Sequence, residues 1–325
     1  MRRREFIAVL SAMAWPLSAR AQQPALPVVG FVSGRSSDDS AHYGAAFRRG
    51  LNETGTVEGQ HVTVEYHWLE GRHDRLPSLM ADLVRRRVAV IATTTTPATL
   101  AARAATTTIP IVFAVAEDPV KLGLIASLAR PGGNATGINV FVQEILGKRL
   151  GLLHLLAPKA VRIAVLVNPA NAPIAESTLR DIPEAARALG LQIQVLNAST
   201  SREIEAVFAT LVRERADALF VTTDGLFASR RVQFATLAAR HAIPATYPDL
   251  DFVKAGGLVS YGTDIADAYR HVGVYAGQIL KGAKPADLPV IQSTKFVFAI
   301  NLQTARALSL TVPPDLLSIA DEVIE

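Results

Sequence analysis

Short apolar segments alternate with amphipathic segments along most of the chain, and this alternation predicts the fold class. Each apolar segment is rich in β-branched residues, ends in a polar or Gly/Pro-containing loop, and precedes apolar residues at helical spacing. Repeated strand–helix units form mostly parallel sheets that are covered by helices on both faces. We therefore expect an α/β protein.

The predicted elements form two series of similar order. The first series has strands at 27–33, 61–68, 88–93 and 109–116, with helices near 40–54, 74–87, 97–106 and 119–129. The second series has strands at 161–168, 191–196, 216–223 and 243–247, with helices near 173–190, 201–214 and 228–241. A strand at Gly256-Gly257, a helix near 264–281 and a strand near 296–300 follow. Two such series predict two Rossmann-like lobes with parallel sheets.

The strand at 61–68 differs from the others because apolar and polar residues alternate along it, which predicts an edge strand. Its polar face carries His61, Glu65 and His67, a set that resembles metal ligands. The two histidines lie roughly 20 Å apart on an extended strand, so one ion cannot bind both. The remaining histidines have no ligand spacing. We therefore predict no metal site and no cofactor.

The first 21 residues have the composition of a secretory signal peptide. Arg2, Arg3 and Arg4 precede an apolar stretch at 6–14, and Ala19-Arg20-Ala21 provides a small-x-small cleavage pattern. Residues 3–7 fit the twin-arginine form, although an ordinary secretory signal remains an alternative. The apolar stretch is shorter than the ~20 residues of a membrane-spanning helix. We expect cleavage after Ala21 and a periplasmic protein.

Composition narrows the functional classes further. Removal of residues 1–21, with four arginines and one glutamate, lowers the formal charge from +4 to about +1, so we expect no nucleic-acid partner. The chain contains no cysteine, which excludes disulfides and lipid attachment through a thiol. We expect a soluble monomer, and the remaining length favours two domains.

Polar side chains follow the predicted strands of both lobes, and ligands of open α/β sheets bind at the carboxyl ends of strands. In the first lobe, the candidate ligand-binding residues are Ser33, Gly34, Ser36, Thr95, Thr96, Glu117 and Asp118. In the second lobe they are Asn168, Asn171, Asp224 and Tyr247. Taken singly, such residues are more often helix N-caps. Hydroxyls and helix N-termini suit a carboxylate, and carboxylates suit an ammonium, so their combination predicts a site for a zwitterion.

Several segments resemble the ABC transporter substrate-binding protein family that includes tryptophan- and tyrosine-binding receptors. They span the chain from 109 to its end: 109–120 (IPIVFAVAEDPV), 128–137 (LARPGGNATG), 255–262 (AGGLVSYG), 279–290 (ILKGAKPADLPV), 295–296, 300–302 and 321–324. The resemblance implies a type I periplasmic-binding-protein fold, with three hinge crossings near 141, 262 and 291. It implies an N-terminal lobe at 27–141 plus 263–291 and a C-terminal lobe at 142–262 plus 292–325.

The resemblance also implies a function. The chain would be the solute-binding subunit of an ABC importer. Its expected partners are a membrane permease and a small-molecule ligand, which we expect to be an amino acid or a related zwitterion. By position, Tyr261 would face the cleft together with Ser33, Thr96, Asp118, Asn168, Asp224 and Tyr247.

Two other functional classes remain as alternatives. A secreted ligand-sensing module uses the same fold, which by itself does not define function. An α/β enzyme is disfavoured because the sequence contains neither a nucleophile-elbow GxSxG nor a phosphate-binding GxxxxGK[ST].

Overall fold

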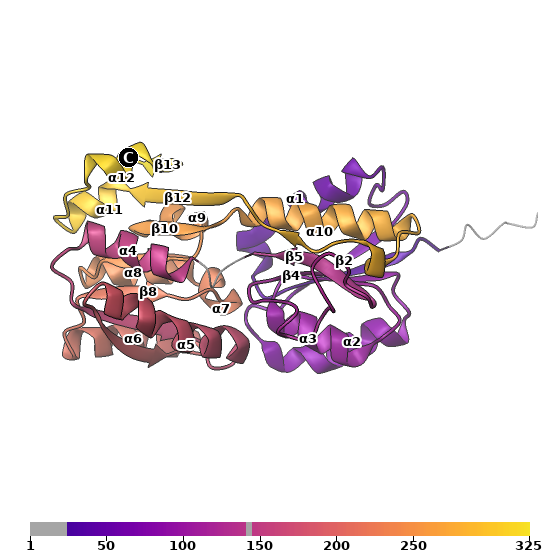
Figure 1. Cartoon of the computed structure of the whole chain (residues 1–325), viewed down its shortest axis with the longest axis horizontal. Helices are drawn as coiled ribbons and strands as arrows, with labels where there is room; N and C mark the ends of the chain where they lie inside the picture. Colours follow the sequence, from indigo (N-terminus) through magenta and orange to yellow (C-terminus); the bar gives the residue numbers. More distant parts are fainter. Residues whose placement is uncertain (1–24, 141–144) are drawn as a thin grey trace, which may run out of the picture.

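The computed structural model describes residues 25–140 and 145–325, which form two α/β lobes that lie side by side (Figure 1). Each lobe contains one sheet with helices packed against it. The predicted signal peptide and the predicted crossing at 141 lie outside the described residues.

The first lobe contains a six-stranded sheet in which all neighbouring strands are parallel. From one edge to the other, its strands are β2 (Thr63–Trp68), β1 (Val28–Ser33), β3 (Val90–Thr93), β4 (Ile111–Val115), β5 (Ala135–Asn139) and β11 (Ile291–Gln292). Its helices are α1 (Ser37–Glu53), α2 (Leu76–Arg85), α3 (Thr96–Ala105) and α10 (Ile265–Leu280), with 3-10 turns at His73–Arg75 and Pro285–Asp287. The edge position predicted for the 61–68 strand is confirmed.

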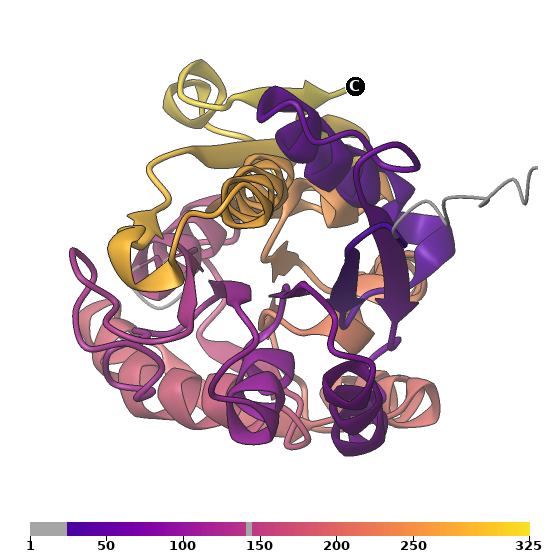
Figure 2. The same cartoon turned by 90° about the vertical axis from the view of Figure 1, so that its right-hand side faces the viewer.

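Apolar side chains pack on both faces of this sheet. Helices α1 and α10 cover one face, and α2 and α3 cover the other (Figures 1 and 2). Helix α10 follows a strand of the second lobe but packs closely along α1, because Gly50 and Gly273 bring the two backbones together: a β-carbon at Gly273 would lie 2.1 Å from the Phe47 carbonyl oxygen.

The second lobe contains a seven-stranded sheet. Its strands, in order, are β7 (Gln192–Asn197), β6 (Arg162–Val167), β8 (Ala218–Val221), β9 (Ala245–Tyr247), β10 (Val259–Thr263), β12 (Phe296–Asn301) and β13 (Glu322–Ile324). Only β10 and β12 pair antiparallel among these strands. The helices are α4 (Leu146–Leu156), α5 (Ala172–Ala188), α6 (Ser201–Arg213), α7 (Gly225–Ser229), α8 (Arg231–Arg240), α9 (Leu250–Lys254), α11 (Leu302–Ala307) and α12 (Pro314–Ser318).

The chain passes between the two sheets three times. The passages follow β5, β10 and β11, because β5 and β11 belong to the first sheet whereas β10 and β12 belong to the second. The lobe boundaries near residues 141, 262 and 291, and their role as hinges, remain predictions.

Three sequence-based element predictions are corrected. The helix expected near 119–129 is wrong: Gly123 adopts a left-handed φ of +69°, and the segment forms hydrogen-bonded turns instead. The single helix expected near 228–241 is two helices, α7 and α8, that meet at Arg230. The strand expected at Gly256-Gly257 begins only at Val259, because Gly256 has a φ of +104° in the turn after α9. The sequence analysis does not predict helix α4.

The strand order places a crevice in each lobe. The orders β2-β1-β3-β4-β5 and β7-β6-β8-β9-β10 are equivalent, with the second strand of each series at the edge outside the first. The chain that leaves β1 therefore runs to one side of the sheet, and the chain that leaves β3 runs to the other. The same holds for β6 and β8 in the second lobe. Ligands of open α/β sheets bind at such switch points.

Candidate functional site

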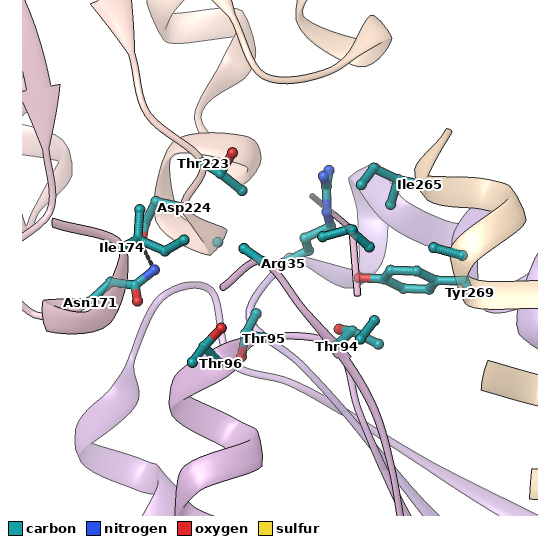
Figure 3. Close-up of a pocket in the computed structure, with 15 residues that line it drawn as sticks. Arg35, Thr94, Thr95, Thr96, Asn171, Ile174, Thr223, Asp224, Ile265 and Tyr269 are labelled. Carbon is teal, nitrogen blue, oxygen red and sulfur yellow. Dashed lines mark hydrogen bonds between the residues drawn. The ribbon is translucent and has the colours of Figure 1, made fainter. Parts of the chain in front are cut away.

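A cavity lies between the lobes where these two switch points face each other (Figure 3). Arg35 and Thr94–Thr96 line it from the loops after β1 and β3, and Asn171 and Thr223–Gly225 line it from the loops after β6 and β8. The cavity contains about 600 Å³ of empty space, part of which is open to solvent.

Four of the lining side chains carry a buried polar atom without a hydrogen-bond partner among the described residues. These atoms are Arg35 Nη1, Thr95 Oγ1, Asn171 Oδ1 and Thr223 Oγ1. Buried polar groups in folded proteins almost always have a partner, because an unmade hydrogen bond leaves the cost of desolvation uncompensated. The cavity is therefore suited to a polar ligand that bonds to both lobes.

Asp224 supplies the carboxylate of the cavity. Its Oδ1 accepts from the backbone N–H groups of Leu226 (2.9 Å) and Phe227 (3.3 Å), so it is the N-cap of α7. Asn168 Nδ2 also donates to Oδ1, and Asn171 Nδ2 donates to Oδ2, both at 3.0 Å. Three of these four hydrogen bonds are made to Oδ1. Oδ2 accepts only one, so it can accept a further hydrogen bond from a ligand.

Arg35 supplies the cation. Its Nη2 donates to Asp249 Oδ2 of the second lobe at 2.7 Å, and its guanidinium lies over the Tyr43 ring at 4.7 Å. Burial is the largest single effect and opposes the charged form, but Asp249, Tyr43 and Tyr269 together outweigh it and raise the pKa of Arg35 above its ordinary value. Arg35 is therefore charged at any physiological pH.

Glu117 lies behind the cavity wall rather than in it. The Thr96 hydroxyl donates to Glu117 Oε2, and Oε1 has no partner among the described residues. Burial raises the pKa of Glu117, an effect that the Thr96 hydrogen bond partly offsets. This arrangement fixes the orientation of Thr96.

The opposite wall is apolar. It consists of Ala114 in β4 and Ala116 just after it, Val140 after β5, and three residues of α10, Ile265, Ala268 and Tyr269. The Tyr269 hydroxyl lies 3.4 Å from Ser33 Oγ, which holds the ring at the cavity edge (Figure 3).

The structure brings together some of the residues predicted from the sequence. Thr95, Thr96, Asn171 and Asp224 line the cavity. Four others contact lining residues directly: Ser33 contacts Tyr269, Gly34 packs against Thr95 and Gly225, Glu117 bonds to Thr96, and Asn168 bonds to Asp224.

The other four predicted residues lie away from the cavity lining. Ser36 Oγ donates to Asp39, and Asp118 Oδ1 accepts from the N–H groups of Val120 and Lys121. Tyr247 is fully buried and stacks on Phe252, at 4.9 Å between ring centroids. Tyr261 accepts from Lys148 and stacks on Phe296. A ligand-contact role for these four stays a prediction without support from this cavity.

Sequence reasoning missed Arg35, Thr94, Thr223 and the apolar wall. Arg35, Thr94 and Thr223 lie in loops that the strand-end rule had already selected, but their chemistry was not singled out. The α10 residues had a weaker signal: the spacing of 265, 268 and 269 indicates one helix face, but not which surface that face contacts.

Among residues 25–140 and 145–325, no group of three or more His, Cys, Asp or Glu side chains is placed to hold a metal ion. No helix in this part of the chain is long and apolar enough to cross a membrane.

Comparison with known proteins decides the family. The sequence model of the family "ABC transporter substrate binding protein" matches residues 26–324, which is nearly the whole chain beyond the predicted signal peptide. The chain belongs to this family. The type I periplasmic-binding-protein fold expected from the sequence is confirmed.

Individual relatives agree with this assignment. A tyrosine-binding protein of Clostridioides difficile (strain R20291) is 29% identical over 266 residues, covering 81% of this chain and 75% of the relative. The solved structure of a Streptococcus pneumonia ABC domain in complex with L-Trp is 25% identical with a TM-score of 0.83, covering 92% and 100% of the two chains. A ligand-free, open substrate-binding protein with adhesive properties from Clostridium difficile is also 25% identical, covering 92% and 99%, but its TM-score is 0.63.

Membership of this ABC transporter substrate-binding family establishes the general function. The protein binds a small molecule and works with a membrane permease. Proteins of the family are typically extracytoplasmic, which agrees with the predicted export signal.

Proposed function

We propose that this ABC transporter substrate-binding protein captures an amino acid in the cavity between its lobes. The observation that carries the proposal is the set of buried polar atoms that lack partners. Thr95 and Arg35 contribute such atoms from the first lobe, and Asn171 and Thr223 contribute them from the second. A ligand that bonds to both sets compensates their desolvation and holds the lobes together.

The second lobe is suited to the ligand's ammonium group. Asp224 Oδ2, Asn171 Oδ1 and Thr223 Oγ1 are acceptors in neighbouring loops, and an ammonium has three hydrogen atoms to donate. The carboxylate of Asp224 makes one of these bonds charge-assisted, which is worth ~1.5 to 3 kcal/mol.

The first lobe is suited to the ligand's carboxylate. Helix α3 begins at Thr96 in the cavity lining, no side chain caps its N-terminus, and the Thr95 hydroxyl has no partner and can donate. The ligand side chain then lies against the apolar wall formed by Ala114, Ala116, Val140 and α10. Since one relative binds tyrosine and one structure holds L-Trp, L-tyrosine and L-tryptophan are the first ligands to test.

The described arrangement of lobes supports a closed, ligand-binding form. Two solved structures have the same 25% identity to this chain, yet the TM-score is 0.83 for the L-Trp complex and 0.63 for the ligand-free, open protein. A TM-score falls when two lobes are rotated relative to each other, even if each lobe is unchanged. We therefore propose that ligand binding closes the lobes by a hinge motion.

We also propose that the protein is a periplasmic monomer that releases its ligand chemically unchanged. Family membership supports both the location and the absence of catalysis. Recovery of the bound ligand after denaturation, with mass spectrometry, tests the second point.

The decisive experiment is a thermal-shift screen of the purified mature protein against the twenty amino acids, followed by calorimetry. A ligand that binds only the folded state raises stability by RT ln(1 + [L]/Kd), about 2.7 kcal/mol at a hundredfold excess over Kd. We expect a shift with at least one amino acid and none with its decarboxylated or deaminated analogue. Equal shifts with those analogues would contradict recognition of a zwitterion.

A further inference from the structure

A buried ion pair joins the two lobes beside the cavity. Arg35 follows β1 in the first lobe, and Asp249 follows β9 in the second, where it is the N-cap of α9. Arg35 Nη2 donates to Asp249 Oδ2 at 2.7 Å, and the two side chains are only 10% and 5% exposed. Such a pair is buried only when the lobes are in contact.

The charges around this pair are complementary across the cleft. Asp251 Oδ2 of the second lobe lies 3.9 Å from Arg35 Nη1 and 3.3 Å from His42 Nε2. The first lobe thus contributes Arg35 and His42, and the second contributes the two carboxylates. The His42 side chain is already 52% exposed, so separation of the lobes would return Arg35 and the two carboxylates to water.

Arg35 and Asp249 differ in their relation to the ligand. Arg35 lines the cavity, whereas Asp249 does not. We propose that Asp249 is a positioning residue: it holds the Arg35 guanidinium in the cavity wall and, as one half of an interlobe ion pair, makes ligand affinity depend on lobe closure. This proposal rests on the amino-acid-binding function proposed above.

The ion pair should affect the free energy of ligand binding more than that of unfolding. Removal of one partner leaves the other charge buried and unpaired, which is strongly unfavourable, whereas removal of both partners leaves no such charge. In an open protein the remaining charge is hydrated. The loss is therefore expected in the ligand affinity and not in the thermal stability of the ligand-free protein.

A double-mutant cycle tests this coupling. Arg35→Met keeps the aliphatic stem, and Asp249→Asn keeps an N-cap while it removes the charge. With L-tryptophan and L-tyrosine as probes in calorimetry, we expect each single variant to bind at least tenfold more weakly than wild type. The double variant should lose about as much as one single variant. Losses that multiply in the double variant would overturn the proposal.

A second ion pair across the cleft provides a matched control. Arg231 Nη2 donates to Asp39 Oδ1 at 2.9 Å, but the Asp39 side chain is 36% exposed, so solvent screens the pair. We expect Asp39→Asn to change affinity less than threefold. A loss as large as that of Asp249→Asn would show that any interlobe charge has this effect and would overturn a specific role for Asp249.

A distance measurement tests the ion pair without a ligand. The chain has no cysteine, so Ala104→Cys in α3 and Ala206→Cys in α6, both exposed, place one spin label on each lobe. In the ligand-free protein, the closed form gives the shorter distance between the two labels. We expect Arg35→Met and Asp249→Asn to lower the fraction of molecules with this shorter distance equally, with no further change in the double variant. If the wild-type protein binds none of the amino acids, the proposed function is contradicted. The distance measurement tests the ion pair separately: distance distributions that are the same in wild type and in the variants would overturn the ion-pair proposal.

Discussion

The backbones of Gly34 and Gly225 meet across the cleft, and a β-carbon built at Gly225 would lie 2.5 Å from the carbonyl oxygen of Gly34. Gly34 follows β1 in the first lobe, and Gly225 begins α7 in the second. The lobes therefore approach each other at a point where there is no room for a side chain. This contact offers a direct test of closure.

Gly225→Ala is expected to hinder closure, because the added methyl group collides with backbone that cannot move aside. We expect at least tenfold weaker ligand binding and little change in the melting temperature of the ligand-free protein. Small-angle scattering should show a radius of gyration that falls on saturation with ligand for wild type but less for the variant. Gly133→Ala is the control, since its β-carbon meets nothing within 4 Å. A normal Kd for Gly225→Ala would contradict a closed ligand-bound state of this geometry.

Asp224→Asn is expected to weaken ligand binding at least tenfold, because it removes the charge that would pair with the ammonium group. Asparagine is an equally good N-cap through its Oδ1, and a flip of the Asn171 amide lets Asn171 Oδ1 accept from the new Nδ2, so the stability of the ligand-free protein should change little. Calorimetry and thermal melting measure the two effects separately. Unchanged affinity would restrict Asp224 to the capping of α7.

Thr95→Val and Thr223→Val should weaken binding with little effect on stability. The hydroxyls that they remove are hydrated when the lobes are open, so the stability of the ligand-free protein should change little. Each also removes a bond to the ligand, and affinity should fall by roughly tenfold. Thr178→Val is a matched control, because its hydroxyl is equally buried and unpartnered but lies outside the cavity lining. It should gain stability without a loss of affinity, and a similar loss of affinity in all three variants would contradict the assignment.

Glu117 should make stability depend on pH in a known direction. Burial raises its pKa in the folded protein above the ordinary value of 4.5, so the folded state binds the proton more tightly than the unfolded state. Its contribution is therefore fully present below pH 4.5 and is lost as the pH rises through the folded pKa. Melting temperatures of wild type relative to Glu117→Gln should fall with increasing pH across this window. A difference that stays constant or grows with pH would contradict the shift.

The exported protein should begin at Gln22. The arginine-rich start and the Ala19-Arg20-Ala21 pattern predict cleavage after Ala21. Intact-mass measurement of the periplasmic fraction tests this directly. Cytosolic protein that retains Met1 as the dominant species would contradict it.

The sequence by itself determined the fold class and part of the site. Alternation and helical spacing are local properties, so they were sufficient for the strand–helix order and for the edge strand β2. The same order selected the loops at the carboxyl ends of β3, β6 and β8. For this reason the sequence predicts Thr95, Thr96, Asn171 and Asp224, which line one cavity in the folded protein.

Only the tertiary structure decided which side chains face the cavity. Tyr247 follows the strand-end rule, but its ring points to the face of the sheet that packs on Phe252. Ser33 and Tyr269 are 236 residues apart in sequence, and they meet because α10 returns to the first lobe and packs along α1. The pairing of Arg35 with Asp249 likewise depends on how the two lobes meet. Local periodicity carries no information about such long-range contacts, because they arise from packing between elements and not from the order of residues within one element.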